Sequence, residues 1–188
     1  MTTIRILLLL VIVAAVLLLL FWRFSVRPSR MTTSANGITF PTVSGSNLAR
    51  QELEFPRDFA GELNLLFVPF LREQQSVVNT WIPYAEMLES STAGLIYYEL
   101  PTIYQMSMVS RTFINEGMRA GIPDPKARER TVTLYVDLDQ FMQATGIADK
   151  NDVHILLVDR TGNILWRTVG AFDEEKGQSL RRAVDDAL

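Results

Sequence analysis

The stretch Ile155-Leu-Leu-Val-Asp-Arg-Thr-Gly-Asn-Ile-Leu-Trp166 decides the fold that this sequence predicts. It consists of an apolar run, a turn that contains glycine and a second apolar run. An apolar run bounded by turn residues is typical of a strand buried on both faces. The turn at residues 160–163 therefore predicts an antiparallel hairpin between residues 153–158 and 164–169.

Strands and helices alternate upstream of this hairpin. Apolar and β-branched runs predict strands at residues 63–70, 94–100 and 131–136. Apolar residues spaced three and four apart predict helices at 72–90 and 103–120, and Pro83 predicts a kink or a later start in the first. The second helix carries one apolar stripe, which consists of Met106, Val109, Phe113, Ile114 and Met118.

Three further segments complete the expected order of elements. Residues 137–146 and the end of the chain after Gly170 predict helices, whereas the charged segment 124–130 predicts a solvated loop. Residues 38–48 alternate around Ser44-Gly45, which predicts a hairpin continued by residues 53–55. The order predicts an α/β fold, with a mixed sheet flanked by helices on both faces and a β-hairpin extension at the amino-terminal end.

The first residues predict one transmembrane helix. After a tail at residues 1–5, residues 6–22 are apolar and uncharged, and they end at aromatic residues beside Arg23. A cleaved signal peptide is the alternative, but no small-residue cleavage site follows the run. Residues 23–37 read as a flexible basic tether, and residues 38–188 as the folded domain.

Charge is divided unevenly between these parts. Four of the 18 basic residues precede residue 39, whereas all 21 acidic residues follow it, so the domain carries 14 against 21 and a net charge of −7. An acidic domain argues against a nucleic-acid partner. Three of the four early arginines follow the predicted span, so the positive-inside rule favours the cytoplasmic side for the domain of the predicted single-pass protein. The outward-facing orientation is the alternative, because the two sides differ by about one charge.

Several stretches resemble a known superfamily. Phe40-Pro-Thr-Val-Ser-Gly45 and Leu53-Glu-Phe-Pro56 lead into Asn64-Leu-Leu-Phe-Val-Pro-Phe70, and the hairpin at 155–166 follows later. Together they look like the thioredoxin-like superfamily, especially the peroxiredoxin group (alkyl hydroperoxide reductase and thiol-specific antioxidant) and membrane-anchored thiol–disulfide proteins. The resemblance covers residues 38–188 and implies a thioredoxin-like mixed sheet. A looser likeness to a thioredoxin-like ATP synthase assembly factor implies action by holding a membrane-protein partner.

The chain departs from these families where their chemistry takes place, because it contains no cysteine. Counted from Phe70, the family's two thiols fall on Gln75 and Val78, and its cis-proline falls on Val153, where we expect a trans bond. Disulfide exchange and thiol peroxidase chemistry need a thiolate and are excluded. We therefore expect a redox-inactive domain without catalytic residues or a cofactor.

The same surface is the candidate partner-binding site. It comprises Glu73, Gln74, Gln75, Val153 and His154. Trp81 and Tyr84 either edge a peptide-binding groove beside it or belong to the core, and His154 is either a surface residue or a satisfied core imidazole. No spacing of histidine and carboxylates predicts a metal site.

Three classes of function remain open. The first is a membrane-tethered protein-binding or assembly module, the second a structural subunit of a membrane complex, and the third a cysteine-independent enzyme.

Overall fold

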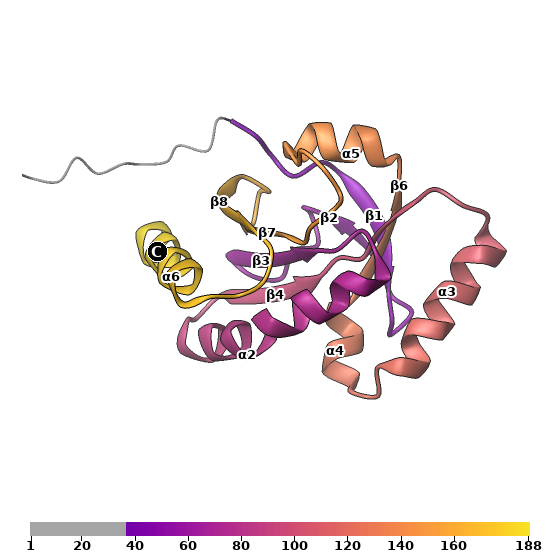
Figure 1. Cartoon of the computed structure of the whole chain (residues 1–188), viewed down its shortest axis with the longest axis horizontal. Helices are drawn as coiled ribbons and strands as arrows, with labels where there is room; N and C mark the ends of the chain where they lie inside the picture. Colours follow the sequence, from indigo (N-terminus) through magenta and orange to yellow (C-terminus); the bar gives the residue numbers. More distant parts are fainter. Residues whose placement is uncertain (1–36) are drawn as a thin grey trace, which may run out of the picture. The chain divides into compact units, whose positions relative to one another are not determined.

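The structure is a computed structural model that describes residues 37–188 (Figure 1). The predicted tail and anchor, and the predicted tether up to residue 36, lie outside the described residues. Within residues 37–188, every helix is too short or too polar to serve as a membrane span.

Two four-stranded sheets form the centre of the domain. The first has the order β4-β3-β7-β8 and consists of β3 (Leu63–Val68), β4 (Leu95–Glu99), β7 (His154–Asp159) and β8 (Ile164–Val169). The second has the order β2-β1-β6-β5 and consists of β1 (Val43–Asn47), β2 (Glu52–Phe55), β5 (Thr102–Tyr104) and β6 (Val132–Val136). Because β4 runs parallel to β3 whereas β7 runs antiparallel to it, the predicted mixed pairing is confirmed.

The short segment between β4 and β5 joins the two sheets. On one side, Leu100 N donates to Phe67 O at 2.7 Å and Thr102 N donates to Pro69 O at 2.9 Å. On the other side, Leu134 N donates to Pro101 O at 2.9 Å. Since proline has no N–H, Pro101 donates nothing toward β6, and the ladder is interrupted there. The single sheet expected from the sequence is thus two sheets that share this segment.

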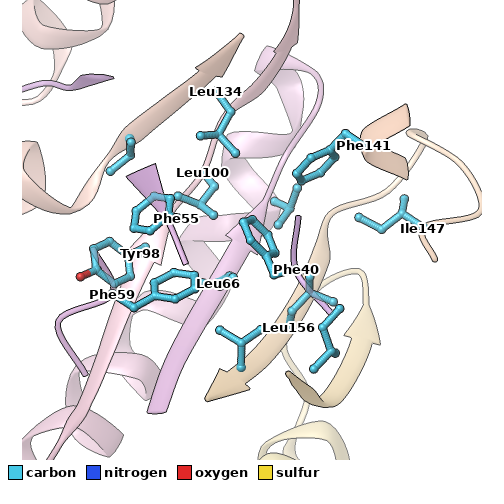
Figure 2. Close-up of a cluster of buried hydrophobic side chains, with 14 residues drawn as sticks. Phe40, Phe55, Phe59, Leu66, Tyr98, Leu100, Leu134, Phe141, Ile147 and Leu156 are labelled. Carbon is cyan, nitrogen blue, oxygen red and sulfur yellow. The ribbon is translucent and has the colours of Figure 1, made fainter. Parts of the chain in front are cut away.

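Helices cover both faces of the β4-β3-β7-β8 sheet, as predicted (Figure 1). One face packs against α2 (Gln75–Ser91) and α6 (Glu174–Ala187), and Trp81 and Leu180 lie fully buried in that cluster. The other face packs against α5 (Leu138–Thr145) and the β1–β2 hairpin. Figure 2 shows its aromatic and aliphatic side chains, which include Phe40, Phe55, Phe59, Leu66, Tyr98, Leu134, Phe141 and Leu156. Successive residues of β3 and β7 contribute to opposite clusters because strand side chains alternate.

Side-chain caps fix the ends of these helices. The carboxylate of Asp137 accepts from Gln140 N at 3.1 Å at the start of α5, and Gly146 ends that helix in the left-handed region at φ 66°. Asp173 caps α6 in the same way, accepting from Lys176 N at 2.8 Å. These caps agree with the acidic and glycine signals in the sequence.

The hairpin of β1 and β2 turns at a different place from the one predicted. The chain reverses at residues 48–51, where the side chain of Asn47 accepts from Gln51 N at 2.8 Å and Arg50 adopts φ 68°. Gly45 lies inside β1 instead, paired with Leu53 of β2 and Leu134 of β6. Gly45 therefore allows β1 and β6 to approach each other closely, and it does not form a turn.

Three segments also differ from the prediction in their helical structure. The predicted helix at 103–120 divides into β5 and α3 (Met108–Gly121), because Thr102 to Tyr104 pair with β6. The predicted loop at 124–130 is the short helix α4 (Pro125–Arg130), capped by Asp124, which accepts from Ala127 N at 2.8 Å. Asp124 followed by Pro125 is a signal for the start of a helix, and the prediction of a loop, which relied on the charge pattern, overlooked it. The helix at 72–90 instead begins with a 3₁₀ turn, η1 (Arg72–Gln74), and α2 continues past Pro83 to Ser91.

The close packing of β1 on β6 yields a stability prediction. An alanine Cβ at position 45 would lie 2.7 Å from Thr133 O and 2.8 Å from Leu134 Cδ2. We expect Gly45→Ala to lower the free energy of unfolding by about 1–3 kcal/mol, as overpacking does. Urea unfolding of the full chain in detergent measures this, with Ser44→Ala on the exposed side of β1 as the control. Equal stability of the two variants would contradict the packing described.

Candidate functional site

The turn between β3 and α2 is held in place by the side chain of Gln74. Its Oε1 accepts from Phe70 N at 2.7 Å and from Leu71 N at 3.2 Å. Its Nε2 donates to Lys150 O at 2.8 Å, in the loop that precedes β7. The side chain is buried, so this amide links two loops from inside the domain and offers no free group to a partner.

His154 also contacts the loop that precedes β7, at Asp149. Its Nε2 lies 2.8 Å from Asp149 O, and its ring stands edge-on to Phe70 with a centroid distance of 6.2 Å. His154 is the first residue of β7, opposite Val68, and it is buried, as is Val153 before it. Of the two interpretations of this histidine, the satisfied core imidazole therefore holds.

The two positions that match the family's thiols hold inert side chains in different surroundings. Gln75 is exposed at the start of α2, where its Nε2 donates to Glu99 Oε2 at 2.9 Å and to Asn79 Oδ1 at 3.1 Å. Val78 is fully buried in the core beneath α2. The bond before Val153 is trans as expected, since within residues 37–188 the cis peptide bond is Phe55–Pro56.

Trp81 belongs to the interior, and Tyr84 is half-buried between α2 and α6. Trp81 is fully buried, and its Nε1 donates to Gly170 O at 2.9 Å. Tyr84 Oη donates to Gly177 O at 2.7 Å, and both rings pack on Phe172, with centroids 5.2 Å and 5.0 Å away. The aromatic pair thus fastens α2 to α6 and to the segment before it.

The structure brings the candidate residues together, but it exposes only two of them. The contact of Gln74 with Lys150 places the start of α2 beside the loop before β7, as the resemblance implies. Gln74, Val153 and His154 are buried, whereas Glu73 and Gln75 are exposed. A partner that approaches this edge would therefore meet Glu73 and Gln75.

Glu99 is a half-buried carboxyl group at this edge. It ends β4, half-buried, and burial raises its pKa, while the hydrogen bond donated by Gln75 opposes that rise. In the part of the chain that the structure describes, no three histidine, aspartate or glutamate side chains converge as metal ligands would. The edge thus presents a hydrogen-bonded carboxyl and amide pair.

The most exposed apolar surface lies elsewhere, on α3 and just before it. Val109 and Phe113 were predicted to share a stripe with Ile114 and Met118, but the structure separates the two pairs. Ile114 and Met118 are half-buried, whereas Val109 and Phe113 are 81% and 82% exposed. Tyr104 and Met108, which precede them in the chain, are 64% and 81% exposed. We call Tyr104, Met108, Val109 and Phe113 the α3 apolar face.

The sequence contained a signal for this face that the stripe interpretation missed. At about 100° per residue, Val109 and Phe113 project from the opposite side of the helix to Ile114 and Met118. Apolar residues on two sides of a helix at the edge of a domain leave one side without cover. The spacing thus indicated two faces, of which the domain itself covers one.

Comparison with known proteins identifies the fold. No protein-family model and no curated protein matches the sequence. Among solved structures, a thiol:disulfide interchange protein from Bacteroides sp. is similar at a TM-score of 0.53 and 16% identity, over 79% of this chain and 90% of that one. BsSco, a member of the Sco family of cytochrome c oxidase assembly proteins, is similar at a TM-score of 0.53 and 10% identity, over 80% and 95%.

A third similar structure is the pneumococcal exposed lipoprotein thioredoxin from Streptococcus pneumoniae strain TIGR4. Its TM-score is 0.50 at 9% identity, over 78% of this chain and 99% of that one. These likenesses show that the domain has a thioredoxin-like fold. At such identities they show the fold alone, and the likeness to peroxiredoxins stays an expectation from the sequence.

The hydrogen bonds of Gln74 predict that its substitution destabilises the domain more than substitution of the neighbouring Glu73. Gln74→Ala leaves Phe70 N and Lys150 O without their partner, so we expect it to lower the free energy of unfolding by about 1–3 kcal/mol. Glu73→Ala changes an exposed residue and should alter stability by no more than about 0.5 kcal/mol. Urea unfolding of both full-chain variants in detergent makes the comparison. Equal losses would contradict the structural role of Gln74.

The burial of Glu99 predicts a dependence of stability on pH. Because its pKa is raised in the folded protein, folding favours the protonated form, and stability falls as pH rises from about 4.3 through the folded pKa. We expect Glu99→Gln to exceed the wild type in stability at about pH 7, and to lose that advantage below about pH 4. Urea unfolding across this range tests it, with exposed Glu86→Gln as the control. A difference that does not change with pH would refute the argument.

Proposed function

We propose that this cysteine-free, thioredoxin-like domain is a membrane-tethered, redox-inactive module that acts by binding protein. The observation that carries the proposal is the α3 apolar face, exposed on a domain whose thiol positions hold Gln75 and Val78. A soluble domain that exposes large apolar side chains side by side is typically a binding partner of another surface. Without a thiolate, the scaffold has no means of disulfide exchange.

The tether rests on the sequence of the first residues. The apolar run 6–22 and the basic residues after it support a retained single-pass anchor, with the domain on the cytoplasmic side. A domain held at a membrane meets partners that are held there as well, which suits an assembly role. BsSco, which shares the fold, belongs to a family of assembly proteins, and this supports the same role here.

Two surfaces can take part in binding. The α3 apolar face offers four large side chains, whereas the edge at the start of α2 offers Glu73 and Gln75. A stable interface needs a desolvated apolar centre with polar residues around it. The α3 apolar face provides such a centre and is the primary contact, while the α2 edge is the secondary one. A structural subunit of a membrane complex would use the same contacts permanently.

Affinity capture of the full chain tests this proposal. Membranes that contain the tagged protein are first washed with carbonate, then solubilised in mild detergent and captured. We expect the protein to remain in the washed membranes and to bring down protein at a fixed ratio. Phe113→Asp should remove the captured protein, whereas Met87→Asp, which changes an exposed methionine on α2, should not.

The other outcomes decide against the proposal. If the carbonate wash releases the protein from the membranes, the proposed membrane tether is wrong. Capture that persists in Phe113→Asp but fails in Glu73→Lys/Gln75→Lys would move the contact to the α2 edge. Disulfide reduction by the purified full chain, at a rate above a mock preparation, would show that the domain is an enzyme.

A further inference from the structure

We propose that the α3 apolar face binds a second copy of this chain, through antiparallel pairing of the two α3 helices about a two-fold axis. The inference deepens the proposed function and rests on it, because it names the partner of the same surface. It is carried by the packing of α3, by the pattern of large and small residues on its outer side and by the charge of the domain.

α3 packs weakly on its own domain. None of its residues is buried, and Figure 1 shows it at the periphery, beside α4 and away from β7 and β8. Ile114 and Met118 are only half-buried against the domain, and the other links are polar: Tyr135 Oη donates to Asn115 Oδ1 at 2.8 Å, and Arg50 pairs with Glu116 at 3.0 Å. A helix of 14 residues is marginal without apolar packing. A second surface against its outer side would supply that packing.

The outer side of α3 carries no charge. At about 100° per residue, six exposed residues fall within about a third of the helix circumference. They are Val109, Ser110, Phe113, Gly117, Ala120 and Gly121. The charged residues Arg111 and Arg119 fall well outside this third, and Glu116 lies about 20° beyond its edge, next to Val109. Glu116 is already paired with Arg50 at 3.0 Å, so a partner that covers the outer side meets no unpaired charge, which favours an uncharged surface such as the same side of another copy.

The large and small residues of this side are complementary under a two-fold axis. If the axis passes level with residue 115, Phe113 of one copy faces Gly117 of the other, and Val109 faces Gly121. Ser110 then faces Ala120. Every large side chain thus meets a glycine, and each contact occurs twice, as an isologous interface requires. In a parallel pair Phe113 would face Phe113 and Gly117 would face Gly117, which packs poorly.

The domain itself gives no reason for Gly117 to be glycine. It lies in the interior of α3 without a positive φ, and a Cβ there would meet nothing within 4 Å. Glycine in a helix interior is less stable than alanine. An aromatic ring from a second copy that occupies this space supplies the missing reason.

The area of the face suits a weak dimer. Val109 and Phe113, the large side chains that this pairing uses, offer on the order of 150 Å² each, so two copies bury roughly 600 Å² through them. That area is below the lower limit for a specific interface in solution, so the dimer depends on the anchoring of both copies in one membrane, which raises their effective concentration. A membrane surface with anionic lipids is the less suitable occupant, because the domain carries a net charge of −7 and no lysine or arginine lies on the outer side of α3.

Cysteine crosslinking in isolated membranes tests the pairing, and the absence of native cysteine makes it specific. In Ser110→Cys/Ala120→Cys each new thiol faces the other position of the second copy. Within one chain the two positions are about 15 Å apart along the helix, too far for a disulfide. We expect oxidation of the full-chain double variant to give a covalent dimer, and either single variant to give little.

A matched pair of substitutions assigns the dimer to this side of α3. Gly117→Leu fills the space for Phe113, so it should lower the crosslinked yield of the double variant and weaken association at least about 30-fold. Thr112→Leu adds a similar side chain on the same helix but outside the uncharged third, and it should leave the yield unchanged. Both positions are exposed, so the fold is retained in each variant.

Each remaining outcome overturns the inference. If Ala120→Cys alone crosslinks as well as the double variant, the antiparallel pairing is wrong. If no dimer forms but Phe113 is still needed to capture a different protein, the second copy is the wrong partner and the proposed function stands. If neither a dimer nor a Phe113-dependent capture is found, the proposed function fails as well. Phe113-dependent binding of the monomer to lipid vesicles would assign the face to the membrane.

Discussion

The burial of β3 on both faces is the constraint on which the rest of the structure depends. All six of its residues are buried, and its backbone pairs with β4 on one side and β7 on the other. The one polar side chain, Asn64, is satisfied in both directions by Gly61, with bonds of 3.0 Å and 2.9 Å. Such a strand requires cover above and below, which α2, α6, α5 and the β1–β2 hairpin provide.

The same constraint explains why the thiol positions of this fold can be lost without loss of the domain. The start of α2 is positioned by β3 and by the amide of Gln74, not by any sulfur. Val78 adds to the core beneath α2, and His154 braces the loop before β7. A scaffold stabilised in this way keeps its shape without sulfur, and α3, none of whose residues is buried, lies at the periphery of the domain (Figure 1).

Local signals in the sequence predicted much of the fold because burial and turn chemistry act over a few residues. The apolar runs at β3 and β7, the turn before β8 and the helix at residues 137–146 were all predicted. The turn between β1 and β2 was predicted at the wrong residues, and the exposed side of α3 was combined with the covered side in one apolar stripe. Gly45 is glycine because β6 lies against it, and β6 is remote in the sequence. Gln74 resembled a surface residue, although Lys150 completes its hydrogen bonds from a distant loop.

The sequence by itself determined the class of fold and, through the absence of cysteine, the exclusion of thiol chemistry. Local patterns and composition suffice for these two, because apolar periodicity indicates the type of each element and a missing thiol group cannot be supplied by folding. Only the tertiary structure decided which candidate residues are accessible. Burial depends on what the rest of the chain places against a side chain, so Gln74, Val153 and His154 became interior, while Val109 and Phe113 remained in solvent.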